Sequence, residues 1–265
     1  PFFADVTRGV EDVARDNDYA LILSNSDEDP DQQRLAVDTL KTESVDGVIV
    51  PPVSAEDPAV HDLLNTDIAV VCVDRRLASA RVDAILSANR EGAYEAVSHL
   101  IKLGHERIGF IGGVPRISTS TERREGYEQA LRNHDLPVDP ALIKEGDSRR
   151  ERGTYLTNDL LDLDPPPTAL FTGNNLTTLG ALSAINVRGL KVPDDVALVG
   201  YDDIPWPMAL NPPPTVVDQP GYEMGRRAAQ TLLERLAHPD RAPTTVTLQP
   251  KLVVRQSCGA AVETE

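Results

Sequence analysis

The sequence predicts an α/β fold made of two similar halves, each built around a parallel sheet. Short apolar runs alternate with segments of helical periodicity along the whole chain, which is typical of βαβ units. The series is too long for one open sheet, and the pattern restarts near residue 87. With 265 residues, the chain fits one large or two medium domains, and we expect halves of about 1–86 and 87–217.

In the first half, the start of each helix and the end of each strand carry recognisable signals. Asp29 is a good N-cap, and Pro30 suits the first helical position. Pro51 and Pro52 stop the apolar run that precedes them. Helices are expected at 3–17, 29–42 and 60–65, with strands or extended segments at 19–23, 47–50, 68–73 and 82–86.

The second half repeats the pattern. Gly104 and Gly189 are typical of the residue that follows a helix. Helices are expected at 89–103, 121–134, 150–163, 175–187 and 220–237. Strands are expected at 107–112, 143–145, 168–172, 196–199, 216–218, 244–248 and 251–254. The last helix and the last two strands fit either half.

Composition and charge exclude several classes of function. The formal charge is 26 − 42 = −16, so this segment should repel nucleic acid. Cys72 and Cys258 give no disulfide framework, which favours a reducing, cytoplasmic compartment. No apolar run reaches the length of a membrane span and no signal peptide is visible. Because the chain opens at Pro1 without a methionine, we expect a fragment of a longer protein.

The motifs that usually carry chemistry are weak. Residues 109–113 are glycine-rich but lack the spacing of a dinucleotide site, and close packing explains them better. The acidic run 27–31 lacks the glycine and glutamate of a calcium loop and suits a helix start. The five histidines form no zinc motif, and no nucleophile elbow is present. We therefore expect no enzyme, no catalytic residue, no metal and no cofactor.

Polar side chains follow the predicted strands, and the clearest example is the apolar run 196–199, which leads to Asp202, Asp203 and Trp206. In an open parallel sheet, ligands bind beyond the carboxyl ends of the strands. Two interpretations of the two acids remain open here, a binding cleft or a solvated loop. Carboxylates, guanidinium groups and amides that converge on one cleft would suit a polyhydroxylated ligand.

Eight motifs in order along the chain resemble the effector-binding domain of LacI/GalR-family transcriptional regulators. They cover essentially the whole chain, and their order is more specific than any one of them. They are Pro1–Ala4, Asn25–Asp29, Val45–Ile49, Val73–Arg75, Leu100–Ile108 (L-I-K-L-G-H-E-R-I), Arg123–Tyr127, Gly200–Asp203 and Leu252–Ser257.

The resemblance implies a type I periplasmic-binding-protein-like fold, with two Rossmann-like subdomains and parallel sheets joined by three crossover strands. Crossings are expected near 86–88, 217–220 and 247–250. The N-terminal subdomain would contain 1–86 and 220–247, and the C-terminal subdomain 87–219 and 248–265. The ligand would lie between them. Its expected contacts are Phe2, Phe3, Asp74, Arg123, Ser148, Asn174, Asp202, Trp206 (as a lid, from its position alone) and Gln219.

The chain also departs from the family pattern. Ser148 stands where many members stack an aromatic ring on the ligand, Asn175 replaces an aspartate, and Pro51 replaces an asparagine found in some members. The first strand of the fold and the DNA-binding helix-turn-helix module are expected upstream of Pro1, outside this chain.

The resemblance predicts a ligand-sensing domain of a cytoplasmic regulator. Its expected partners are a small polar effector, a second copy in a homodimer, and operator DNA through the absent module, without a membrane. A sugar is favoured because position 148 lacks an aromatic, although purines also bind members of the family. The alternatives are a secreted solute-binding protein of a sugar transporter and a sugar hydrolase or kinase, and the latter lacks motifs.

Overall fold

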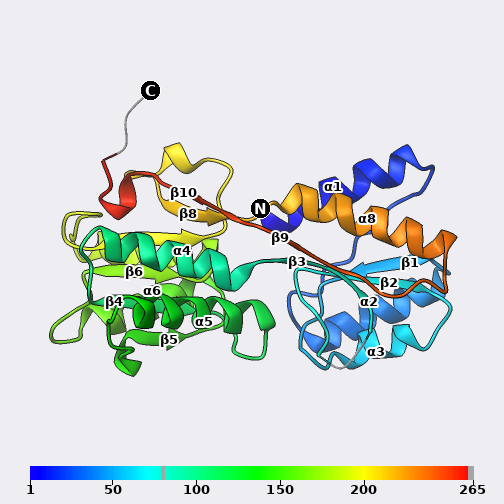
Figure 1. Ribbon diagram of the computed structural model, residues 1–265, viewed down its shortest axis with the longest axis horizontal. Coiled ribbons are helices and arrows are strands. Elements are labelled where there is room, and N and C mark those ends of the chain that lie inside the picture. The colour runs from blue at the N-terminus through cyan, green and yellow to red at the C-terminus, as the bar shows by residue number, and fades with distance from the viewer. Residues whose placement is uncertain (79–80, 262–265) are drawn as a thin grey trace.

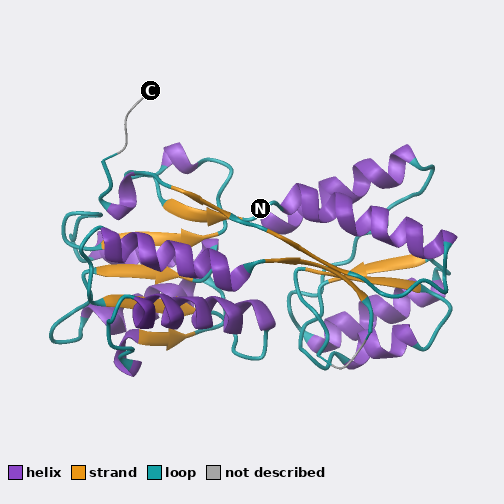
Figure 2. Ribbon diagram, viewed as in Figure 1, coloured by secondary structure: helices purple, strands orange, loops and turns teal. Residues whose placement is uncertain are grey.

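The computed structural model describes residues 1–78 and 81–261 and contains two lobes, each with its own sheet and its own helices (Figures 1 and 2). The predicted α/β architecture with parallel sheets is confirmed. Among the described residues, no helix combines the length and the apolar composition that crossing a membrane requires.

The N-terminal subdomain is built on a four-stranded parallel sheet in the order β1-β2-β3-β9. Because successive side chains of a strand point to opposite faces, Val71 packs on one side of β2 and Cys72 on the other. Helices α1 and α8 cover the first face, and α2 and α3 cover the second. The elements are β1 (Gly47–Val50), β2 (Ala69–Val73), β3 (Asp83–Ser87), β9 (Thr245–Leu248), α1 (Phe2–Asp16), α2 (Pro30–Thr42), α3 (Pro58–Leu64) and α8 (Gly221–Ala237).

The C-terminal subdomain has a six-stranded sheet in the order β10-β8-β7-β6-β4-β5, in which only β10 is antiparallel to its neighbour. Phe171 and Val199 pack under α4 and α5, whereas Leu170 and Leu198 pack against α6 and α7. The elements are α4 (Asn89–Lys102), β4 (Ile108–Gly112), α5 (Ser118–Asn133), β5 (Ile143–Glu145), α6 (Arg150–Leu161), β6 (Ala169–Thr172), α7 (Asn175–Val187), β7 (Ala197–Tyr201), β8 (Thr215–Asp218) and β10 (Lys251–Val253).

Three passages of chain connect the two lobes: from β3 into α4, from β8 into α8, and from β9 into β10 (Figure 1). They confirm the three predicted crossings. The predicted subdomain boundaries at 86, 219 and 247 lie next to these passages and stay predictions.

Most element boundaries agree with the sequence to within a few residues, and the differences have physical causes. The Asp29 carboxylate caps α2 by accepting from the backbone N–H groups of Asp31 and Gln32, as predicted. Helix α3 begins two residues earlier than predicted, because buried Asp57 caps it and Pro58 occupies its first turn. The strand predicted at 19–23 is wrong: no described strand pairs with this segment, and Leu23 is 72% exposed.

Helices α1 and α8 approach so closely that glycine is required on both sides of the contact. A Cβ atom at Gly225 would overlap the Val6 carbonyl oxygen, and one at Gly9 would overlap the Tyr222 carbonyl oxygen. This pair of helices covers one face of β2 and β3, and Asp74 directly follows β2.

We expect Gly225→Ala to destabilise the protein by about 1–3 kcal/mol, because the added methyl group forces α1 and α8 apart. This loss should appear even though alanine favours a helix interior over glycine by about 0.5–1 kcal/mol. Urea unfolding followed by circular dichroism measures it. The control is Gln230→Ala in the same helix, and equal stability of both variants would contradict the packing explanation.

Candidate functional site

Two aspartates occupy equivalent positions at the tips of strands in the two sheets. Asp74 follows β2, and its backbone N–H donates to the Ile85 carbonyl of β3 (2.9 Å). Asp202 follows β7, and its N–H donates to the Val217 carbonyl of β8 (2.8 Å). Both have left-handed backbones, with φ of 66° and 67°. Such a conformation is costly for a residue other than glycine, and it clusters at functional sites.

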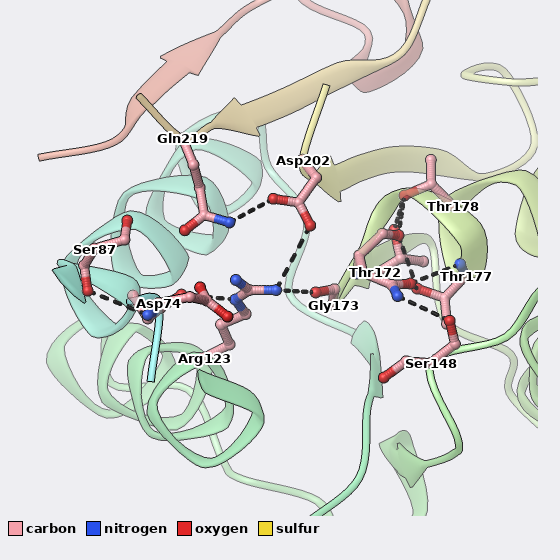
Figure 3. A network of polar contacts seen from close by, with 12 residues as sticks. Asp74, Ser87, Arg123, Ser148, Thr172, Gly173, Thr177, Thr178, Asp202 and Gln219 are labelled. Atoms are coloured by element: carbon pink, nitrogen blue, oxygen red, sulfur yellow. Dashed lines mark hydrogen bonds and ion pairs between the residues drawn. The ribbon is translucent and has the colours of Figure 1, made fainter. Parts of the chain in front are cut away.

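Arg123 of α5 lies between these two strand tips, in a cleft bordered by both lobes (Figure 3). Its Nε donates to Asn89 Oδ1 (2.8 Å) and its Nη1 to the Gly173 carbonyl (2.6 Å). Nη1 also lies 3.8 Å from Asp202 Oδ2, and the guanidinium stacks 3.7 Å from the centre of the Tyr201 ring. The side chain is only 8% exposed, so these partners replace its hydration.

Asp74 is a second buried charge in the cleft. Burial raises the pKa of its carboxyl group, and the cations Arg75 and Arg123 offset part of this increase. Arg75 Nε lies 3.2 Å from Asp74 Oδ2, and the other end of Arg75 pairs with Glu28. The cleft therefore holds carboxylates and guanidinium groups away from bulk water.

The structure separates Asp202 from its neighbour Asp203. Gln219 donates its amide to Asp202 Oδ1 (2.6 Å), which keeps that carboxylate beside Arg123. Asp203 instead forms a two-pronged ion pair with Arg255, with distances of 2.9 and 2.5 Å. One acid of the pair thus faces the cleft, and the other ties its loop to the C-terminal segment.

Four buried side-chain oxygens of this region make no hydrogen bond of ordinary geometry among the described residues: Asp74 Oδ1, Ser87 Oγ, Tyr201 OH and Gln219 Oε1. The hydroxyl groups of Ser87 and Tyr201 nevertheless interact with each other, so Asp74 Oδ1 and Gln219 Oε1 are the two without any partner in this part of the structure. Buried polar atoms normally find partners in a folded protein. Asp74 directly follows β2, Ser87 ends β3, Tyr201 ends β7 and Gln219 directly follows β8. A ligand with several hydroxyl groups, or bound water, would satisfy them.

Ser148 and Asn174, both predicted to touch the ligand, contact each other. Ser148 has a left-handed φ of 64°, and its carbonyl accepts from Asn174 Nδ2 (2.8 Å). Asn174 Oδ1 accepts from the Thr177 backbone N–H (2.8 Å) and from its hydroxyl (2.7 Å) in a capping box at the start of α7. Ser148 lies beside Thr177 (Figure 3), and the Asn174 side chain is already occupied, so the ligand contacts of both residues stay predictions.

The aromatic predictions also stay untested. Phe2 and Phe3 open α1, with ring centres 5.1 Å apart in an edge-to-face arrangement, and Phe2 packs on the core under α8. Trp206 is 60% exposed in the loop between β7 and β8, next to the short 3-10 turn η2 (Pro207–Ala209). Its exposure neither supports nor contradicts a role as a lid.

Sequence reasoning missed several residues of the site. Ser87 and Tyr201 contribute buried hydroxyl groups, and Asn89 holds Arg123. Ser87 is the one polar residue in the apolar run 84–88, and this break in the pattern could have indicated its place in the site. The sequence indicates Asn89 only as the start of a helix. Its contact with Arg123 joins residues 34 positions apart, which no local pattern predicts.

The described residues hold no group of three or more His, Cys, Asp or Glu side chains arranged to bind a metal ion. The acidic run 27–31 is used in part to cap α2, as the sequence analysis favoured. The glycines at 109 and 112 sit on β4, where a Cβ atom would meet the Leu170 and Phe110 side chains. The cleft between the lobes is therefore the candidate site.

Comparison with known proteins agrees with this geometry. Residues 97–258 match the model of the periplasmic binding protein-like domain. The chain is 34% identical over 259 residues to the HTH-type transcriptional repressor PurR of Mannheimia succiniciproducens, covering 97% of this chain and 77% of that protein.

Two solved structures are similar over almost their full length. A putative ribose operon repressor from Burkholderia thailandensis is 36% identical with a TM-score of 0.86, covering 95% of this chain and 94% of the other. A LacI family transcriptional regulator from Enterococcus faecium with bound ribose is 27% identical with a TM-score of 0.87, covering 97% and 94%. These relatives are repressors and regulators rather than enzymes.

We expect Asp74→Asn to change how the stability of the unliganded protein depends on pH. Because the pKa of Asp74 is higher in the folded than in the unfolded chain, the folded state binds more protons above pH about 4, and stability falls as pH rises from there through the raised pKa. Asp74→Asn lacks this loss, so its melting temperature relative to wild type should increase from pH 4 to pH 7.

The matched control is Asp38→Asn on the exposed surface of α2, whose melting temperature relative to wild type should stay constant over the same range. Thermal denaturation at a series of pH values measures both. A constant difference for Asp74→Asn would show that the Asp74 carboxyl is not destabilised by burial.

Proposed function

Because the chain belongs to the LacI/GalR family of transcriptional regulators, as an effector-binding domain, we propose that its effector is a sugar of the ribose class. The observation that carries this proposal is the pair of buried oxygens near Arg123, Asp74 Oδ1 and Gln219 Oε1, that have no hydrogen-bond partner among the described residues. Each hydroxyl of a sugar both donates and accepts, so one small ligand can pair with a guanidinium and with carboxylate or amide oxygens.

The character of the cleft favours a sugar over a purine base. The polar groups Asp74, Arg123, Asp202 and Gln219 surround the space, and Ser148 offers no ring to stack on a flat base. Two similar solved proteins support a pentose, since one is titled a putative ribose operon repressor and the other contains bound ribose.

The proposed mechanism is a shift between two arrangements of the subdomains. Asp74 belongs to one lobe, whereas Arg123 and Asp202 belong to the other, so a ligand that contacts all three favours the closed arrangement. In a homodimer, this shift would change the spacing of DNA-reading modules outside this chain. Effector and operator binding would then be reciprocally linked. Such a regulator would work in the cytoplasm, where its operator lies.

We expect D-ribose to bind the cleft and to raise the melting temperature of the protein in proportion to its saturation. Asp202→Asn and Arg123→Gln should each weaken binding about tenfold or more, because each removes a charge-assisted hydrogen bond inside the cleft. Isothermal titration calorimetry with D-ribose, other pentoses, hexoses and purine bases gives the dissociation constants.

The matched control for this experiment is Asp203→Asn, which changes the adjacent carboxylate whose partner is Arg255. It should bind D-ribose as wild type does. Binding of a purine base with no response to any sugar would overturn the proposed ligand class, and wild-type affinity in both cleft variants would overturn the site.

A separate test addresses the proposed homodimer. Light scattering should give a mass of about twice 28.8 kDa for this chain. A mass of one chain at the highest soluble concentration would contradict dimerisation through this domain and place it in a part of the protein outside this chain.

A further inference from the structure

An unbroken series of polar contacts runs from the surface of the N-terminal subdomain to the effector-facing guanidinium. Arg76, in the segment after β2, pairs with Glu122 Oε1 of α5 at 3.4 Å. Glu122 Oε2 accepts from Asn89 Nδ2 (3.3 Å), at the point where β3 passes into α4. Asn89 Oδ1 in turn accepts from Arg123 Nε (2.8 Å).

We propose that Glu122 is a positioning residue, which makes the orientation of Arg123 depend on closure of the two subdomains. Among the described residues, Arg76 is the one partner of Glu122 from the opposite lobe, whereas Asn89 lies on α4 and Arg123 on α5. Opening the lobes would remove Arg76 and leave Glu122 with the Asn89 amide and the nearby cations Arg123 and Arg90 of its own lobe. Closing them restores the ion pair and fixes the Asn89 amide that holds Arg123.

The surroundings of Glu122 strengthen this contact. Its side chain is 22% exposed, compared with 61% for Arg76, so the carboxylate is the more desolvated partner. Burial raises the pKa of Glu122, and the nearby cations Arg76, Arg123 and Arg90 favour its charged form. Opening the lobes would separate this partly buried carboxylate from one of its cations, which costs free energy. The ion pair therefore favours the closed arrangement of the lobes.

The first test needs no effector. Cysteines introduced at the exposed positions Asp38 on α2 and Glu151 on α6 carry spin labels, because native Cys72 and Cys258 are buried. Electron resonance measures the distance between the lobes. Arg76→Ala and Glu122→Gln should each shift the distance distribution from the closed population to longer distances. An unchanged distribution in both variants would overturn the proposal.

The second test rests on the proposed function and uses D-ribose. Each substitution should weaken binding about two- to fivefold, as expected for a partly exposed ion pair. The dissociation rate should increase while the association rate stays unchanged, since closure follows the encounter. The double variant should lose no more affinity than either single variant, and Arg76→Lys should restore most of it.

The control is Glu125→Gln, which breaks an ion pair with Arg90 that joins the same helices α4 and α5 but stays within one lobe. It should leave the distance distribution and the dissociation rate unchanged. Additive losses of D-ribose affinity in the double variant, or an effect of Glu125→Gln equal to that of Glu122→Gln, would show that Glu122 has only a structural role. If D-ribose does not bind at all, the proposed function fails and the spin-label result still decides the role of Glu122.

Discussion

A guanidinium group that is buried away from water needs hydrogen-bond partners from the protein. In this structure the requirement applies to Arg123, and it determines which groups surround that side chain in the cleft. Its hydrogen bonds reach Asn89 at the start of α4 and the Gly173 carbonyl after β6, and its face covers Tyr201. These partners come from a helix start, a loop and a strand of the C-terminal subdomain, so Arg123 can be satisfied only when that subdomain is correctly assembled. The same contacts leave part of the guanidinium free to meet a ligand.

The doubly wound arrangement of each sheet brings carboxylates close to the Arg123 guanidinium, because the ends of the strands themselves carry them. Parallel strands end at a common edge, so Asp74 after β2 and Asp202 after β7 reach the cleft from two lobes. Both aspartates adopt a left-handed backbone conformation at the strand ends, and burial also raises the pKa of the Asp74 carboxyl group. These costs are offset elsewhere, by the close α1–α8 contact and by cores on both faces of each sheet.

The sequence predicted the alternation of strands and helices because apolar periodicity is a local property, and Asp29 was identified as a cap for the same reason. It failed at residues 19–23, where a strand-like pattern finds no partner strand, since pairing is decided by distant residues. The family motifs predicted Asp74, Arg123 and Asp202 as ligand contacts, and the structure brings these three residues together. The motifs did not identify Asn89 or Glu122, because a positioning contact depends on three-dimensional distance, and neither residue type is unusual at its place.

The selectivity of such a cleft depends more on the buried polar atoms that a wrong ligand leaves unpaired than on the contacts that a suitable ligand makes. Asp74 Oδ1 and Gln219 Oε1 are buried without hydrogen-bond partners among the described residues, so under the proposed function a ligand that lacks matching hydroxyl groups would leave them unsatisfied. An effector site can therefore discriminate among polar metabolites without an aromatic ring at position 148, provided that closure of the lobes excludes water.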